Sequence, residues 1–139
     1  MSTIIRPEIS KKNKYWISKH RYYELKHFCL QYPIWKSAYL SLNEVSIPLS
    51  MIGNVATKNG PGDPTGNRAV LKAYYKDKID LIERVAIDTD RYLYEYLLKA
   101  VTEELSYTYL RSKLDIPCGR DMYYERYRKF FWLLSEARD

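Results

Sequence analysis

Basic, aromatic and acidic side chains crowd the stretch "CGRDMYYERYRKFFWLL", which covers residues 118–134. Arginine can donate paired hydrogen bonds to guanine or phosphate, tyrosine can contact a phosphate or a thymine methyl group, and carboxylates can accept from cytosine. At helical spacing these side chains fall on or beside the face opposite the apolar residues. The residues that we expect to contact duplex DNA are Lys113, Arg120, Asp121, Tyr124, Glu125, Arg128 and Lys129, of which Lys113 and Lys129 would contact the DNA backbone.

A helix that contacts DNA bases in this way needs a partner helix and a tight turn, and the segment 106–137 supplies both. Ser106 is a suitable N-cap for a short first helix, in which Tyr107 and Leu110 recur on one face. Ile116 is an apolar anchor in the turn, and Pro117 prevents the first helix from continuing because it lacks an N–H group. The spacing therefore predicts a helix-turn-helix.

The second helix of this pair has a clear apolar side. Stepping 100° per residue places these aromatic and aliphatic residues in one narrow sector, which we expect to be core: Tyr123, Tyr127, Phe130, Phe131 and Leu134. Arg126 lies on a flank, where it would neutralise backbone phosphates, and Trp132 lies outward, to be covered by N-terminal helices or by another subunit. Two helices of an ordinary core remain an alternative, since carboxylates on the outer face repel phosphate.

Two stretches resemble a known group of regulators. "LSYTYLRSKLDIP" is similar to the entry of a sigma-factor region 4 helix-turn-helix. "DPTGNRAV", a long helix and "IPCGRDMYYERYRKFFWLL" resemble the ArpU/RinA-like regulators of phages and prophages of Gram-positive bacteria, over residues 14–139. The resemblance implies a DNA-binding activator of late phage genes. The chain departs from the sigma-like pattern at Asp115, where glycine is usual, and at Arg111, where a small residue is usual.

The rest of the chain predicts an all-α fold, a helical bundle that carries the helix-turn-helix at its C-terminal end. Apolar spacing indicates helices from Ser18, from Pro33 with a bend, over about six turns after Pro64, and from Tyr92 after a "DTD" break in which Asp88 or Asp90 caps. We expect three segments: a basic arm and bent helical unit at 1–42, a Gly/Pro linker at 43–62, and a helical unit at 63–139.

Charge is distributed unevenly along the 139 residues. The net charge is +6, and residues 1–40 hold 8 basic but only 2 acidic side chains. The stretch "KKNKYWISKHRYYELKHF" predicts either a secondary phosphate-binding patch or an ordinary solvated helix face. Its basic side chains are Lys11, Lys12, Lys14, Lys19 and Arg21. Two basic ends around an acidic middle fit a polyanionic partner.

No arrangement in the sequence predicts an enzyme, a metal site or a cofactor. Cys29 and Cys118 lack the spacing of zinc ligands, and acidic pairs such as Glu103/Glu104 are typical of solvated helix faces. "KNGPGDPTGN" lacks the GK[ST] ending of a phosphate loop. No apolar run predicts a signal peptide or a membrane span, so we expect a cytoplasmic protein in a bacterial host.

The sequence thus predicts a sequence-specific duplex DNA-binding regulator that also contacts RNA polymerase and, from its long helix and outward tryptophan, forms a homodimer. One alternative is a phage-encoded protein-interaction module that binds a host factor through a tyrosine-rich surface, since the chain holds 15 tyrosines. A second alternative is a DNA-packaging adaptor similar to a small terminase subunit, which would assemble as a ring.

Overall fold

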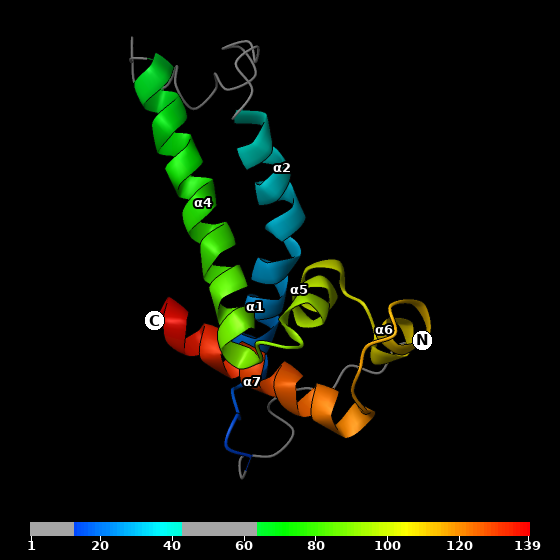
Figure 1. The fold of residues 1–139 in the computed structure, drawn as a ribbon. Coiled ribbons are helices and arrows are strands. Elements are labelled where there is room, and N and C mark those ends of the chain that lie inside the picture. The colour runs from blue at the N-terminus through cyan, green and yellow to red at the C-terminus, as the bar shows by residue number, and fades with distance from the viewer. Residues whose placement is uncertain (1–12, 43–63) are drawn as a thin grey trace. The chain divides into compact units, whose positions relative to one another are not determined.

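A computed structural model describes residues 13–42 and 64–139. These residues form helices and no strands, so the predicted all-α class is confirmed (Figure 1). The helices are α1 (Lys19–Leu30), α2 (Tyr32–Leu42), α4 (Pro64–Thr89), α5 (Tyr94–Glu103), α6 (Tyr107–Lys113) and α7 (Arg120–Arg138). The expected linker at 43–62 and the first part of the basic arm lie outside the described residues.

The first two helices begin where their local sequence predicts. The Ser18 hydroxyl accepts a hydrogen bond from the Arg21 backbone N–H at 3.3 Å and so caps α1. After Gln31, α2 starts at Tyr32, which places Pro33 in its first turn, where a missing backbone N–H costs no hydrogen bond. The sequence predicts a bend at this proline, whereas in the structure α1 ends at Leu30 and a separate helix begins after Gln31.

The α4 helix is 26 residues long and extends further than the sequence indicates. It passes through Asp88 and ends only at Thr89, and the N-cap of α5 is Leu93, so neither Asp88 nor Asp90 is the cap that the sequence suggested. The Asp90 carboxylate accepts from the backbone N–H groups of Tyr92 and Leu93 at 2.8 and 3.0 Å. These bonds fix a turn, and α5 starts after it at Tyr94, two residues later than the apolar spacing indicates.

The division of the chain into compact units does not follow its linear order. Among the described residues, one unit comprises residues 13–32 together with Leu81–Asp139, and the other comprises residues 33–42 and 64–80. Helix α1 therefore belongs with α5, α6 and α7, whereas the sequence groups it with α2 in an N-terminal unit. The reason is long-range packing, because α1 packs against both α5 and α7.

Aromatic side chains dominate the packing of α1 against α7. The Tyr22 ring lies edge-on to Phe131 with centroids 5.1 Å apart, and the hydroxyl groups of Tyr22 and Tyr127 are hydrogen-bonded at 2.5 Å. Tyr22, Phe130, Phe131 and Leu134 are at most 1% exposed. The face of α7 that was expected to be apolar therefore lies in the core. The hydroxyl groups of Tyr22 and Tyr127 hydrogen-bond to each other, so neither is left without a partner.

Candidate nucleic-acid interface

Helices α5, α6 and α7 share one apolar cluster that fixes the candidate interface. Figure 1 shows α5, α6 and the N-terminal half of α7 next to one another. Seven buried residues form the centre of this cluster: Leu93, Leu97, Ala100, Tyr107, Leu110, Ile116 and Tyr123. The short helix α6 would be marginal by itself, so this burial is what holds it in place.

The loop between α6 and α7 is anchored from inside. Ile116 is fully buried, and its backbone N–H donates to the carbonyl oxygen of Leu110 at 3.0 Å. Asp115 before it has a φ of 54°, in the left-handed region that glycine adopts most readily. Its carboxylate lies 3.1 Å from the guanidinium of Arg111, which points to the surface. Arg111 and Asp115 therefore pair with each other on the exposed side of the turn.

Tyr107 connects α6 to the beginning of α7. Its hydroxyl donates to the carbonyl oxygen of Cys118 at 2.7 Å, and its ring lies 5.5 Å from that of Tyr123. The guanidinium carbon of Arg120 lies 5.2 Å from the centroid of the same ring. Such stacking is worth about 0.5–1 kcal/mol at an exposed site. It limits the positions of the Arg120 side chain while its donors remain accessible.

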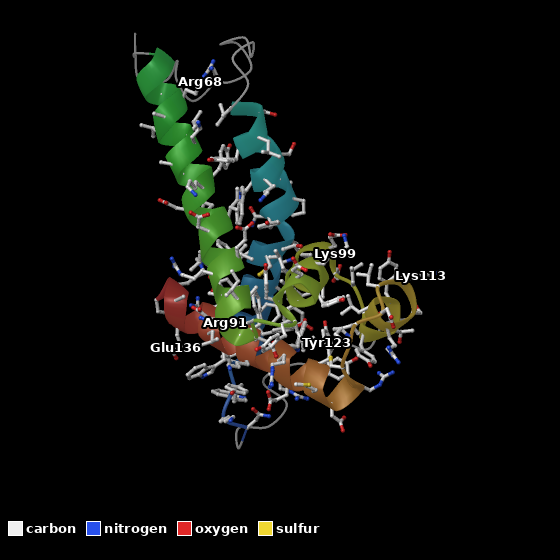
Figure 2. All side chains as sticks on the ribbon, in the orientation of Figure 1. Arg68, Arg91, Lys99, Lys113, Tyr123 and Glu136 are labelled. Carbon is white, nitrogen blue, oxygen red and sulfur yellow. The ribbon has the colours of Figure 1, made fainter. Side chains whose placement is uncertain are left out.

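The first turn of α7 is open to solvent. Arg120 and Asp121 are exposed, and Met122, the next residue, is 46% exposed. Gly119 precedes the helix as its N-cap and makes no side-chain cap. Lys113 is exposed in the last turn of α6, and Figure 2 shows it at the outer edge of that helix. The exposed members of the expected set therefore surround the α6–α7 connection.

The later members of the set are less open. Tyr124 is half-buried, with its ring 6.4 Å from that of Tyr107, and Glu125 is ion-paired with the adjacent Arg126. Arg128 and Lys129 are also half-buried. Along α7, accessibility thus falls from the N-terminal turn toward the middle of the helix, which leaves the first turn as the part best able to enter a groove.

Arg126 is a correction to the expectation from sequence. Its Nε donates to the Asp90 carboxylate at 2.8 Å, and the two side chains are only 23% and 9% exposed. Burial by itself would raise the pKa of Asp90, but the hydrogen bonds from Arg126 and from two backbone N–H groups outweigh it and hold that pKa below its usual value. Arg126 therefore joins α7 to the α4–α5 turn and is not available for phosphate.

The basic patch expected near the N-terminus contains fewer accessible cations than the sequence predicts. Lys14 and Lys19 are exposed, and the Lys14 ammonium lies 5.0 Å from the ring centroid of Tyr15. Arg21 instead donates to the Ser135 hydroxyl and backbone carbonyl, both at 2.9 Å, and pairs with carboxylates of Glu24 and Asp139. We therefore leave Arg21 out of the interface; Lys11 and Lys12 lie outside the described residues.

Trp132 has a partner from the N-terminal segment. Its ring centroid lies 5.8 Å from that of Tyr15, which precedes α1. The sequence allowed cover by the N-terminal helices or by another subunit, and this contact comes instead from the segment that precedes α1. The outward tryptophan is therefore not an argument for a subunit interface.

Sequence reasoning missed the roles of Tyr107 and Asp90. Tyr107 was recognised as a buried helix residue, but its stacking under Arg120 depends on the path of the loop between the two helices. Asp90 was considered only as a possible helix cap, and Arg126 lies 36 positions away from it. No local pattern joins residues that are so distant in the sequence.

Comparison with protein-family models, with curated proteins and with solved structures gives no match for this chain. Within residues 13–42 and 64–139, no three His, Cys, Asp or Glu side chains are grouped so that they could hold a metal ion. None of the helices in the described part of the chain is both long and apolar enough to cross a membrane.

Proposed function

We propose that the chain binds duplex DNA through a helix-turn-helix made of α6 and α7 and acts as a phage or prophage transcriptional regulator. The observation that carries the proposal is the exposed first turn of α7, in which Arg120 rests on Tyr107 beside the buried loop anchor Ile116. Known helix-turn-helix proteins present the N-terminal residues of the second helix to base edges. The resemblance to sigma-factor region 4 and to the ArpU/RinA-like regulators supports the same interpretation.

In this proposal the side chains of the expected set have different tasks. Arg120 stacks on an aromatic ring, so it loses little conformational entropy when it binds a guanine edge or a phosphate. Asp121 beside it would repel phosphate but can accept from a cytosine amino group, so it favours base contact over non-specific binding. Lys113, Arg128 and Lys129 would neutralise phosphates on either side.

Duplex binding can be tested by fluorescence anisotropy with the DNA that flanks the chain's own gene. The variant Arg120→Ala/Arg128→Ala is compared with the unmodified protein at several salt concentrations. Each lost base contact is expected to cost about 1–3 kcal/mol. Each lost phosphate contact should lower the slope of log K against log salt by about 1.

The matched control is Lys72→Ala/Arg84→Ala, which removes the same charge from α4 and leaves α6 and α7 unchanged. It should bind DNA nearly as tightly as the unmodified protein. Equal loss in both double variants would show that only net charge matters. Unchanged binding in Arg120→Ala/Arg128→Ala, with helicity retained by circular dichroism, would refute the assignment of α7.

The two alternative functions can be distinguished by measurements on the same protein sample. A protein-interaction module would show no saturable DNA binding, and its aromatic contacts would respond little to salt. A packaging adaptor would bind DNA but form a ring, whereas the regulator is expected to be a dimer, so a mass measurement in solution separates them. Of the three functions, only the transcriptional regulator is expected to contact RNA polymerase.

A further inference from the structure

The compact unit formed by residues 33–42 and 64–80 has a small core and a large exposed apolar surface. Among the described residues of this unit, the buried hydrophobic side chains are only Trp35, Leu42 and Ile79. Four large hydrophobic side chains of the same unit are between 53% and 69% exposed: Ile34, Leu40, Val70 and Tyr74. Exposed apolar residues that gather in one place are typical of an interaction surface.

Val70 and Tyr74 belong to one continuous exposed side of α4, which we call its outer face. The exposed residues of this face follow one another at spacings of one and three: Ala69, Val70, Ala73, Tyr74 and Asp77. The Lys78 ammonium lies 4.7 Å from the centroid of the Tyr74 ring and limits its movement. Asp77 forms no ion pair within the described part of the chain. Because none of the five residues is basic, the outer face is not suited to a polyanion such as DNA.

The outer face is complementary to itself in size. When two copies of α4 cross antiparallel at a point between residues 71 and 72, Val70 faces the partner's Ala73 and Ala69 faces the partner's Tyr74. Each large side chain then meets a small one, and the alanines let the two helices approach closely. The same contacts recur on the other side of the two-fold axis, as a symmetric dimer requires.

The same register is complementary in charge. Asp77 then lies against the first turn of the partner's α4 at Gly66, which has no side chain to keep the carboxylate away. That turn contains no acidic residue of its own. A carboxylate near the N-terminus of a helix is stabilised by the unpaired N–H groups and by the helix dipole. The symmetry produces this contact twice in each dimer.

We propose that the outer face of α4 joins two copies of this chain, with the two α4 helices antiparallel across a two-fold axis. The partner is a second copy because a single register matches large residues with small ones and a carboxylate with a helix N-terminus. A surface shaped for a different protein would not be expected to match itself in both ways. The proposal goes beyond the proposed function, since it holds whether or not α7 binds DNA, and it locates the dimer expected of a regulator.

The dimer is tested by sedimentation equilibrium of the full chain at about 1–500 µM protein. A contact through one helix face is small, so we expect a reversible equilibrium between monomer and dimer with a dissociation constant in the micromolar range. Val70→Glu should raise this constant at least about tenfold, because it replaces an aliphatic contact near the centre by a charge. Leu40→Glu is the matched control: it makes the same kind of exchange at an exposed position of α2 and should leave the constant unchanged.

A charge exchange tests the register. Asp77→Lys should raise the dissociation constant about three- to thirtyfold, because two favourable contacts are lost in each dimer. Gly66→Asp in the same chain should restore the dimer, because the new lysine then faces a carboxylate of the partner. Circular dichroism shows that each variant keeps its helices.

Three outcomes would each overturn the proposal: an unmodified protein that stays monomeric throughout, equal effects of Val70→Glu and Leu40→Glu, or no restoration by Gly66→Asp. A monomer that still loses DNA binding in Arg120→Ala/Arg128→Ala would leave the assignment of α7 in place. A dimer that binds no DNA would refute the proposed function and leave the dimer contact standing.

Discussion

The ion pair between Asp90 and Arg126 gives a quantitative test of how α7 is held. In Asp90→Asn the side-chain oxygen can still accept from the Tyr92 and Leu93 N–H groups, but the charged bond to Arg126 at 2.8 Å is lost. A hydrogen bond between charged groups contributes about 1.5–3 kcal/mol, and this one is mostly shielded from water. We expect a loss of about 2 kcal/mol of unfolding free energy and a fall of the melting temperature on the order of 10 °C.

The same variant should lose its effect in acid. The pKa of Asp90 is lower in the folded protein than in the unfolded chain, where a carboxyl of this type titrates near about 3.9. The carboxylate therefore stabilises the fold fully above that value, and its contribution disappears as the pH falls through the folded pKa. The difference in unfolding free energy between Asp90→Asn and the unmodified protein should be constant from pH 7 to 5 and shrink below about pH 4.

Urea unfolding followed by circular dichroism measures both effects, and a double-mutant cycle with Arg126→Gln isolates the pair. The coupling energy should be on the order of 1–2 kcal/mol. Asp80→Asn is the matched control, because its ion pair with Lys76 at 2.9 Å is exposed and should be worth only about 0.5 kcal/mol. A loss in Asp90→Asn no larger than in this control, or one that persists unchanged at pH 3, would refute the reasoning.

Substitutions at three further positions test the packing and the connection between α6 and α7. Phe131→Ala empties a site that is 1% exposed and should cost about 3–5 kcal/mol in chemical unfolding. Asp115→Ala should be less stable than Asp115→Gly by about 1 kcal/mol, because both remove the pair with Arg111 but only alanine is strained at a φ of 54°. Gly119→Ser has open space for its side chain and can cap α7, so it should raise the melting temperature by a few degrees.

Local features of the fold could be predicted from the sequence. Ser18 and Ser106 cap their helices through their hydroxyl groups, because N-capping depends only on residues three positions apart. The core side of α7 follows from a period of 3.6 residues, so Tyr123 and Phe131 were expected to be buried. These properties repeat within one or two turns and therefore leave a pattern in the sequence.

Contacts between distant residues could not be predicted in this way. Arg21 looked like a surface cation, yet it bonds to Ser135, 114 positions away, because α1 packs on α7. Arg126 was expected to meet phosphate and meets Asp90 instead. Whether a basic side chain faces water or a carboxylate depends on which helices become neighbours, and apolar periodicity does not specify neighbours.

The contact between α1 and α7 also has a consequence for biosynthesis. Tyr22 and Tyr127 are 105 positions apart, so at a translation rate of about 5–20 residues per second α1 emerges roughly 5–20 s before the helix that covers it. During that interval the apolar side of α1 has no final partner from α7. Until α7 has emerged, the apolar side of α1 that it covers therefore stays accessible to water and to other proteins.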